Sequence, residues 1–129
     1  MSKLIIQVNQ AGYGQGSSYQ ALQFTKAAID AGHEVIKVFF YQDGVLSTNH
    51  LQSPASDEFA LYQAWRELGQ THQVPLVNCV SAALRRGVLS AAESAENQLQ
   101  HWNLEPPFQM GGLGELVTGI EQADRVICF

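Results

Sequence analysis

The sequence of 129 residues is 46% hydrophobic and 15% charged, and its formal net charge is −5. This length and composition are typical of a globular protein with a sizeable core, so we expect one domain over residues 1–129. The acidic balance argues against direct nucleic-acid binding, because a phosphate backbone is held mainly by Lys and Arg. No apolar run approaches the roughly 18 residues of a membrane-spanning helix, so no membrane partner is expected.

The N-terminal segment begins an alternation of strands and helices. Residues 4–8 are predicted to form a buried strand, and the loop at 9–16 that follows contains three glycines. No small-residue cleavage site follows the apolar run, so we interpret it as a strand and not as a signal peptide, and expect a cytoplasmic protein. Ser17 or Ser18 is suited to cap a helix that ends just before Gly32, a typical C-terminal glycine.

The middle of the chain continues this alternation. A second strand, rich in β-branched and aromatic residues, is predicted at 33–41, and a short third strand at 74–77. The 15-residue connection after the second strand contains an Asp43-Gly44 turn. Ser56 is suited to cap the next helix, with two acidic residues in its first turn.

The C-terminal third is expected to hold three helices, one irregular segment and a last strand. These are a short helix at 81–87, a helix begun by a Ser90/Glu93 capping box, the irregular segment 103–112, a helix with the apolar stripe Leu113, Leu116, Val117 and Ile120, and a strand at 125–129. Alternating strands and helices predict a single-domain, three-layer α/β/α fold with a mainly parallel sheet and flavodoxin-like layering. Sites in such sheets lie at the carboxyl ends of the strands.

Cys79 is the main candidate for chemistry at that edge. It follows the third predicted strand and precedes a short helix, whose first N–H groups can stabilise a thiolate. We interpret it as an activated, reachable thiol; the alternative is a small buried hydrophobe. Arg85 and Arg86 lie about 9 Å further along the axis, and we expect them to meet an acidic partner.

Other polar residues offer weaker candidates. The two cysteines are 49 positions apart and the four histidines are scattered, so neither a metal site nor a disulfide framework is expected. His50, in the long connection, is an ordinary loop residue or a neighbour of Cys79. The loop Gly12–Gly16 lacks the lysine of a P-loop and the spacing of a dinucleotide fingerprint. We interpret it as a tight turn that helps to shape the Cys79 pocket, with nucleotide or flavin binding as the alternative.

Several segments resemble the DsrE/TusD family of sulfurtransferases, in the same order and over nearly the whole chain. They include AGYG, HEVIKVFFYQDGV, SPASDEFALYQAW, CVSAALRRGV, GGLGEL and ADRVICF. The resemblance implies that Cys79 carries sulfur as a persulfide, received from a small sulfur-carrier protein and passed to a downstream acceptor protein. It also implies a heterohexamer with two paralogous subunits, two copies of each chain, in the relay for 2-thiolation of the tRNA wobble uridine. Thiol exchange of this kind needs no cofactor.

Three alternatives remain at this stage. Related DsrE-type proteins traffic sulfur in sulfur oxidation, and some related chains are non-catalytic structural subunits that lack the cysteine. A nucleotide-binding module is the third. Cys128 departs from the family pattern; we expect it to be a buried small hydrophobe, although a sulfur close to Cys79 would be able to attack the persulfide and close a disulfide.

Overall fold

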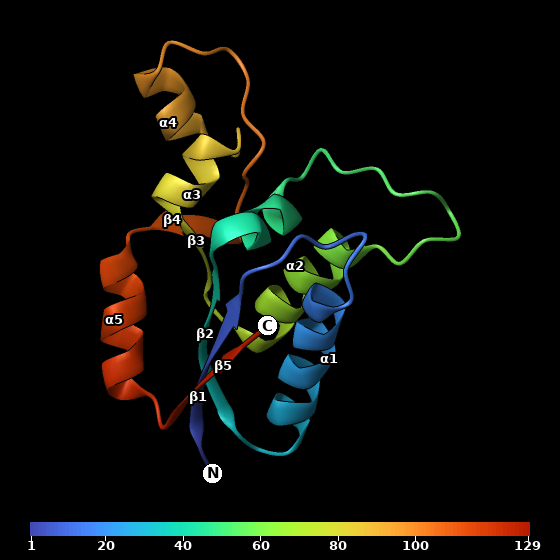
Figure 1. Cartoon of the computed structure of the whole chain (residues 1–129), viewed down its shortest axis with the longest axis vertical. Coiled ribbons are helices and arrows are strands. Elements are labelled where there is room, and N and C mark those ends of the chain that lie inside the picture. The colour runs from blue at the N-terminus through green and yellow to red at the C-terminus, as the bar shows by residue number, and fades with distance from the viewer.

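Five parallel strands form one sheet in the order β4-β3-β2-β1-β5 in the computed structural model, which describes residues 1–129 (Figure 1). The strands are β1 (Lys3–Val8), β2 (Glu34–Phe40), β3 (Leu76–Cys79), β4 (Phe108–Gly111) and β5 (Arg125–Cys128). The helices are α1 (Ser17–Asp30), α2 (Leu61–His72), α3 (Val80–Arg85), α4 (Ala91–Glu96) and α5 (Leu113–Gln122), with a 3₁₀ helix η1 (Gln42–Thr48). The predicted α/β fold with a parallel sheet is confirmed.

The direction of the crossovers explains the layers. The chain moves across the sheet from β1 to β4 and then returns past three strands to β5 at the opposite edge. Because such crossovers are right-handed, the outgoing and returning helices cover opposite faces. Figure 1 shows α1 and α2 on one face and α5 on the other, with α3 and α4 beyond the carboxyl ends of β3 and β4.

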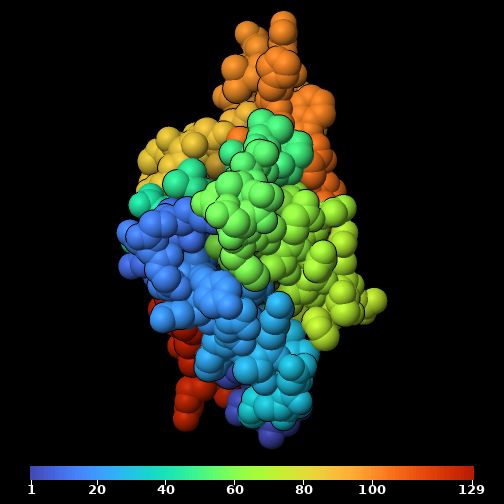
Figure 2. Space-filling model, turned by 90° about the vertical axis from the view of Figure 1, so that its right-hand side faces the viewer, coloured from blue at the N-terminus to red at the C-terminus, as the bar shows by residue number.

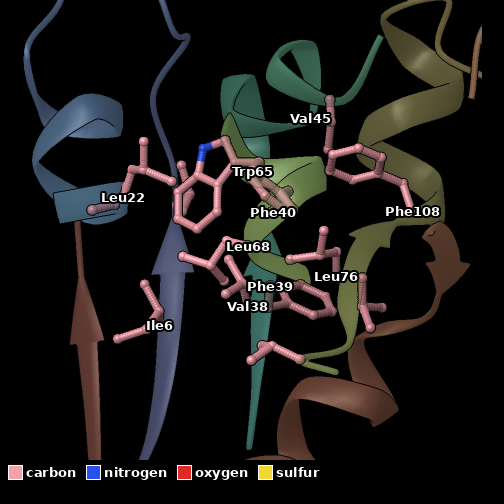
Figure 3. Packing of buried hydrophobic residues seen from close by; sticks show 14 of the residues in the cluster. Ile6, Leu22, Val38, Phe39, Phe40, Val45, Trp65, Leu68, Leu76 and Phe108 are labelled. Atoms are coloured by element: carbon pink, nitrogen blue, oxygen red, sulfur yellow. The ribbon is translucent and has the colours of Figure 1, made fainter. Parts of the chain in front are cut away.

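The core lies mainly between the sheet and the layer of α1 and α2 (Figure 3). Trp65 of α2 is completely buried, and its ring meets Phe40 of β2 edge-on at a centroid distance of 5.4 Å. Phe40 also contacts the ring of Phe108 on β4 at 6.0 Å. Aromatic pairs in this geometry add to the stabilisation from burial alone. The irregular segment expected around Phe108 is therefore wrong: it contains the edge strand β4.

Helix α5 packs on the sheet in a way that the apolar stripe did not predict. Its closest approach is at Gly119, where an added Cβ would lie 2.7 Å from Cδ1 of Ile5. Lys37 of β2 is largely buried beneath it and donates to Oε2 of Glu115 at 2.8 Å. The helix therefore uses a glycine and an ion pair against the sheet. Much of the stripe points to solvent, with Leu113, Val117 and Ile120 all more than two-fifths exposed.

The ends of the first two main helices were only partly predictable. Gly32 has φ +88°, and its N–H donates to the carbonyl of Ile29, so the expected glycine stop is confirmed. No serine caps the start of α1, where Gly16 takes the cap position. The prediction for Ser56 is wrong as well: it lies in an exposed loop, and α2 begins at Leu61. The capping box at α4 is confirmed, with the Ser90 N–H donating to Glu93 at 2.9 Å.

None of the helices combines the length and the apolar character that crossing a membrane requires.

Candidate active site at Cys79

Cys79 is the last residue of β3 and directly precedes α3. Its register partner on β4 is Gly111. Side chains alternate along a strand, so Cys79 shares the sheet face of Val77, which an added Cβ on Gly111 would contact together with Glu115 of α5. Cys79 is thus at the carboxyl edge of the sheet, as expected, and on the face that α5 covers.

The surroundings of Cys79 are closed in the isolated chain. The residue is only 3% exposed and belongs to the main hydrophobic cluster. Helix α3 begins immediately after it, and η1 contacts both β3 and α3. The expectation of a reachable thiol is therefore wrong for the free chain, because an attacking sulfur has no direct route to a residue covered in this way. Any reaction at Cys79 needs a local opening of the carboxyl edge.

The arginine pair has a different role from the one that spacing alone allowed. Arg86 donates to Oδ1 of Asp43 at 2.8 Å, and its Nη1 donates to the carbonyl of Ala82 at 3.1 Å. The acidic partner expected for these arginines is, for Arg86, a residue of the same chain. Arg85 is exposed to solvent. The ion pair joins η1 to α3, the helix that begins directly after Cys79.

A buried polar contact lies beneath η1, next to Cys79 in the sequence. Asn78 is completely buried, and its side chain donates to the Thr48 hydroxyl at 2.6 Å. Thr48 in turn donates to the carbonyl of Val45 at 2.8 Å. Sequence reasoning missed this contact, although a polar residue at the end of an apolar strand is a signal for one. It fixes η1 to the carboxyl end of β3.

Cys128 lies far from Cys79 and is exposed, so its expected burial is wrong. It ends β5, and β1 and β2 separate that strand from β3. Three spacings of roughly 4.8 Å put the two strands about 14 Å apart. A disulfide needs Cα atoms within roughly 7 Å. The two cysteines therefore cannot join without a rearrangement of the sheet, and each acts as a separate thiol.

The other candidates do not gather around Cys79. Gly12 lines a pocket with residues of α1 and of the segment before α2, and Cys79 is not among them. The backbone N–H of His50 donates to the carbonyl of Asn103, while its Nδ1 is buried without a partner. No three His, Cys, Asp or Glu side chains lie close enough together to hold a metal ion. Both free thiols end a strand, Cys79 at β3 and Cys128 at β5, and they differ in burial: Cys79 is buried and Cys128 is exposed.

Several known proteins are similar to this chain in sequence or in fold. The DsrE/DsrF-like family matches residues 2–129. Sulfurtransferase TusD of Pectobacterium carotovorum is 50% identical over 122 residues, and the TusD homolog of Vibrio cholerae is 48% identical, each over 95% of this chain and at least 93% of its own length. A protein of Allochromatium vinosum named DsrE is 39% identical over 98% of both chains. The crystal structure of the E. coli YchN protein covers the whole chain with a TM-score of 0.79 at 23% identity, which reflects the shared fold.

Proposed function

The chain belongs to the DsrE/DsrF-like family, and we propose that it is a sulfurtransferase that carries sulfur as a persulfide on Cys79. The observation that supports this most is the free cysteine at the carboxyl end of β3, the edge where parallel α/β proteins place their sites. Relatives that match almost the whole chain are named sulfurtransferases. Neither thiol is consumed in a disulfide.

The proposed reaction consists of two thiol exchanges. The Cys79 thiolate attacks the terminal sulfur of a donor persulfide, the S–S bond of the donor breaks, and the donor leaves as a thiolate. The acceptor thiolate then attacks the terminal sulfur now on Cys79, takes it as its own persulfide and releases the Cys79 thiolate. One sulfur atom moves in each step and no net oxidation occurs. The two exchanges use only the Cys79 thiol and the sulfurs of the donor and acceptor, so no cofactor is required.

Access to Cys79 is the step that a partner must provide. Helix α3, which begins directly after Cys79, is joined to η1 by the Arg86–Asp43 pair, in which Asp43 is 62% exposed. A pair with that much solvent contributes little to stability, typically less than about 1 kcal/mol. We propose that docking of the donor or acceptor on this edge competes for these charges and lets α3 move away from the thiol.

The proposed partner subunits rest on the family resemblance and on one exposed apolar surface of α5. The apolar stripe of α5 exposes Leu113, Val117 and Ile120 by 48%, 54% and 44%. Exposed apolar stripes of this kind mark subunit contacts. This surface supports a contact with another subunit, and the resemblance implies that the assembly is a hexamer with two paralogous chains and two copies of each. In that assembly a sulfur-carrier protein would load Cys79 and an acceptor protein would unload it, in the relay for 2-thiolation of the tRNA wobble uridine.

Two alternatives have specific observations in their favour. The match to a protein named DsrE favours a sulfur-trafficking role in sulfur oxidation, but its 39% identity is lower than the 50% identity to a TusD protein. The burial of Cys79 favours a structural subunit without transfer activity. We favour a role in tRNA 2-thiolation with an active Cys79 thiol, because Cys79 and the segment CVSAALRRGV that carries the resemblance are both present.

Intact-mass spectrometry tests the loading step. The chain is incubated with a cysteine desulfurase, cysteine and a sulfur-carrier protein, with the partner chains added. We expect a reducible gain of one sulfur, about 32 Da, in the wild type and in Cys128→Ser, and no gain in Cys79→Ser. A gain lost only in Cys128→Ser would move the site to the exposed thiol. The absence of a mass gain in every variant would favour the alternative of a structural subunit without transfer activity.

A further inference from the structure

Two segments that the proposed chemistry does not use form a pocket near the N-terminal ends of α1 and α2. Its volume is about 290 Å³, and it is lined by Gly12, Tyr13, Tyr19, Glu58, Phe59 and Leu61. A second hollow of about 240 Å³ shares Tyr13 and Glu58 with it. Figure 2 shows this side of the molecule, where the blue N-terminal region lies beside the green segment that leads into α2. We call the larger hollow the aromatic pocket.

Specific contacts build the aromatic pocket. The Tyr13 hydroxyl donates to the carbonyl of Phe59 at 2.7 Å and so ties the glycine loop to the segment before α2. The rings of Tyr19 and Phe59 meet edge-on, with centroids 4.9 Å apart and planes at 89°. Gly12 is needed at the base, where an added Cβ would lie 2.7 Å from Cδ2 of Leu61. The walls are therefore held in place although the rings remain accessible.

The lining has the chemistry of a site for a cation. Tyr13, Tyr19 and Phe59 are 43%, 44% and 45% exposed, which is unusual for three aromatic rings around one hollow. Glu58 is the one charged residue in the lining of either hollow, and no Lys or Arg lines them. One Glu58 oxygen accepts the Ala55 N–H at 2.7 Å, so the carboxylate is held in position. Aromatic faces and a carboxylate both attract positive charge.

We propose that the aromatic pocket binds an Arg or Lys side chain of a partner protein that docks on the carboxyl edge of the sheet. The methylene stem would pack against Leu61 and the rings, and the charged head would meet Glu58. The net charge of −5 favours a basic partner surface. The glycine loop follows the carboxyl end of β1, so a protein seated here lies on the same edge as Cys79. The pocket chemistry itself does not depend on sulfur transfer.

An NMR titration tests the pocket directly. The labelled chain is titrated with the capped tripeptide Gly-Arg-Gly, and the matched control replaces Arg by citrulline, which has the same shape and no charge. We expect the Arg peptide to shift the ring signals of Tyr13, Tyr19 and Phe59 with millimolar affinity. The citrulline peptide should bind about threefold more weakly or worse. Absent shifts, or equal affinities for both peptides, would overturn the proposal.

Variants locate the binding and identify its source. Glu58→Gln and Phe59→Leu should each weaken binding of the Arg peptide about threefold, whereas Glu67→Gln, the same change at an exposed position of α2, should not. Circular dichroism verifies that each variant is folded. Unchanged affinity in both pocket variants would overturn the assignment. Tighter binding of free arginine than of the peptide would assign the pocket to a small cation and overturn a partner protein as its occupant.

Discussion

Gly44 is a residue at which the connection after β2 lies very close to the sheet. A Cβ on Gly44 would lie 1.9 Å from the carbonyl oxygen of Val8, the last residue of β1. No rotation of a side chain can relieve this contact, because both atoms belong to the backbone or are fixed by it. The position therefore requires glycine, and it fixes how closely η1 lies on the carboxyl edge.

We predict that Gly44→Ala destabilises the chain by about 3 kcal/mol, since the backbone must shift to admit one methyl group. Urea unfolding followed by circular dichroism measures this. The matched control is Gly114→Ala, where an added Cβ meets nothing within 4 Å and helix propensity predicts a small gain, within about 1 kcal/mol. Equal midpoints for wild type and Gly44→Ala would show that η1 does not rest on β1.

Single residues also show what a sequence can reveal. Gly32 was predictable because its requirement for positive φ is local, and its place just after a helical pattern is a recognised signal. The position of Cys79 at the carboxyl edge was predictable from the apolar run before it, although β3 spans Leu76–Cys79 and not the expected 74–77. Its burial was not, because it depends on the tertiary packing of other elements around the end of the strand, and no local pattern reports such packing.

At the scale of elements, the contact between η1 and α3 is the one that we propose restrains access to the thiol. Arg86 and Asp43 are 43 positions apart, and their ion pair is the charged link between these elements. Exposed ion pairs of this kind hold local geometry, and breaking one changes the free energy of unfolding little. Local opening is then controlled separately from global unfolding.

We predict that Asp43→Asn raises the rate of alkylation of Cys79 by iodoacetamide about two- to fivefold, while the free energy of unfolding changes by less than about 1 kcal/mol. The experiment is done in a Cys128→Ser background, since Cys128 is exposed and would react as well. Asp57→Asn, the same charge change at another exposed position, serves as control. Identical rates for both variants would mean that the pair does not restrain the cover.

The elements themselves were predicted unevenly. Long segments with clear periodicity, such as α1 and α5, were identified, and the Ser90/Glu93 capping box marked the start of α4. Strand β4 was missed because its four residues, FQMG, follow two prolines and show no alternation. The start of α2 was misplaced because Ser56 has the chemistry of a cap, but its loop is used instead to position Glu58 and Phe59 beside Tyr13.

At the scale of the whole molecule, α5 leaves an apolar stripe uncovered. The helix contacts the sheet through Gly119 and Glu115 and packs Leu116 against the core. Leu113, Val117 and Ile120 stay exposed. The stripe predicted an α-helix correctly, and of its four residues Leu116 is the one that packs against the core. An apolar sector wider than the contact with the sheet indicates a subunit interface.

We predict that Val117→Glu leaves the chain folded but prevents assembly with the partner chains, because a charge in an apolar contact must lose its hydration. Native mass spectrometry of the mixed subunits measures the assembly, and thermal unfolding of the isolated chain verifies the fold. Thr118→Glu, one position away and outside the stripe, is the control and should assemble normally. Normal assembly of Val117→Glu would place the interface elsewhere on the chain.

The central claim is that Cys79 passes sulfur on as well as receiving it, and a single-turnover chase tests this most directly. The Cys128→Ser chain is loaded with one sulfur, separated from the donor and mixed with the acceptor protein, and the intact masses of both proteins are followed over time. The account predicts that the chain loses about 32 Da while the acceptor gains the same mass at its cysteine. Sulfur that stays on the chain, or leaves as free sulfide while the acceptor gains nothing, would contradict it.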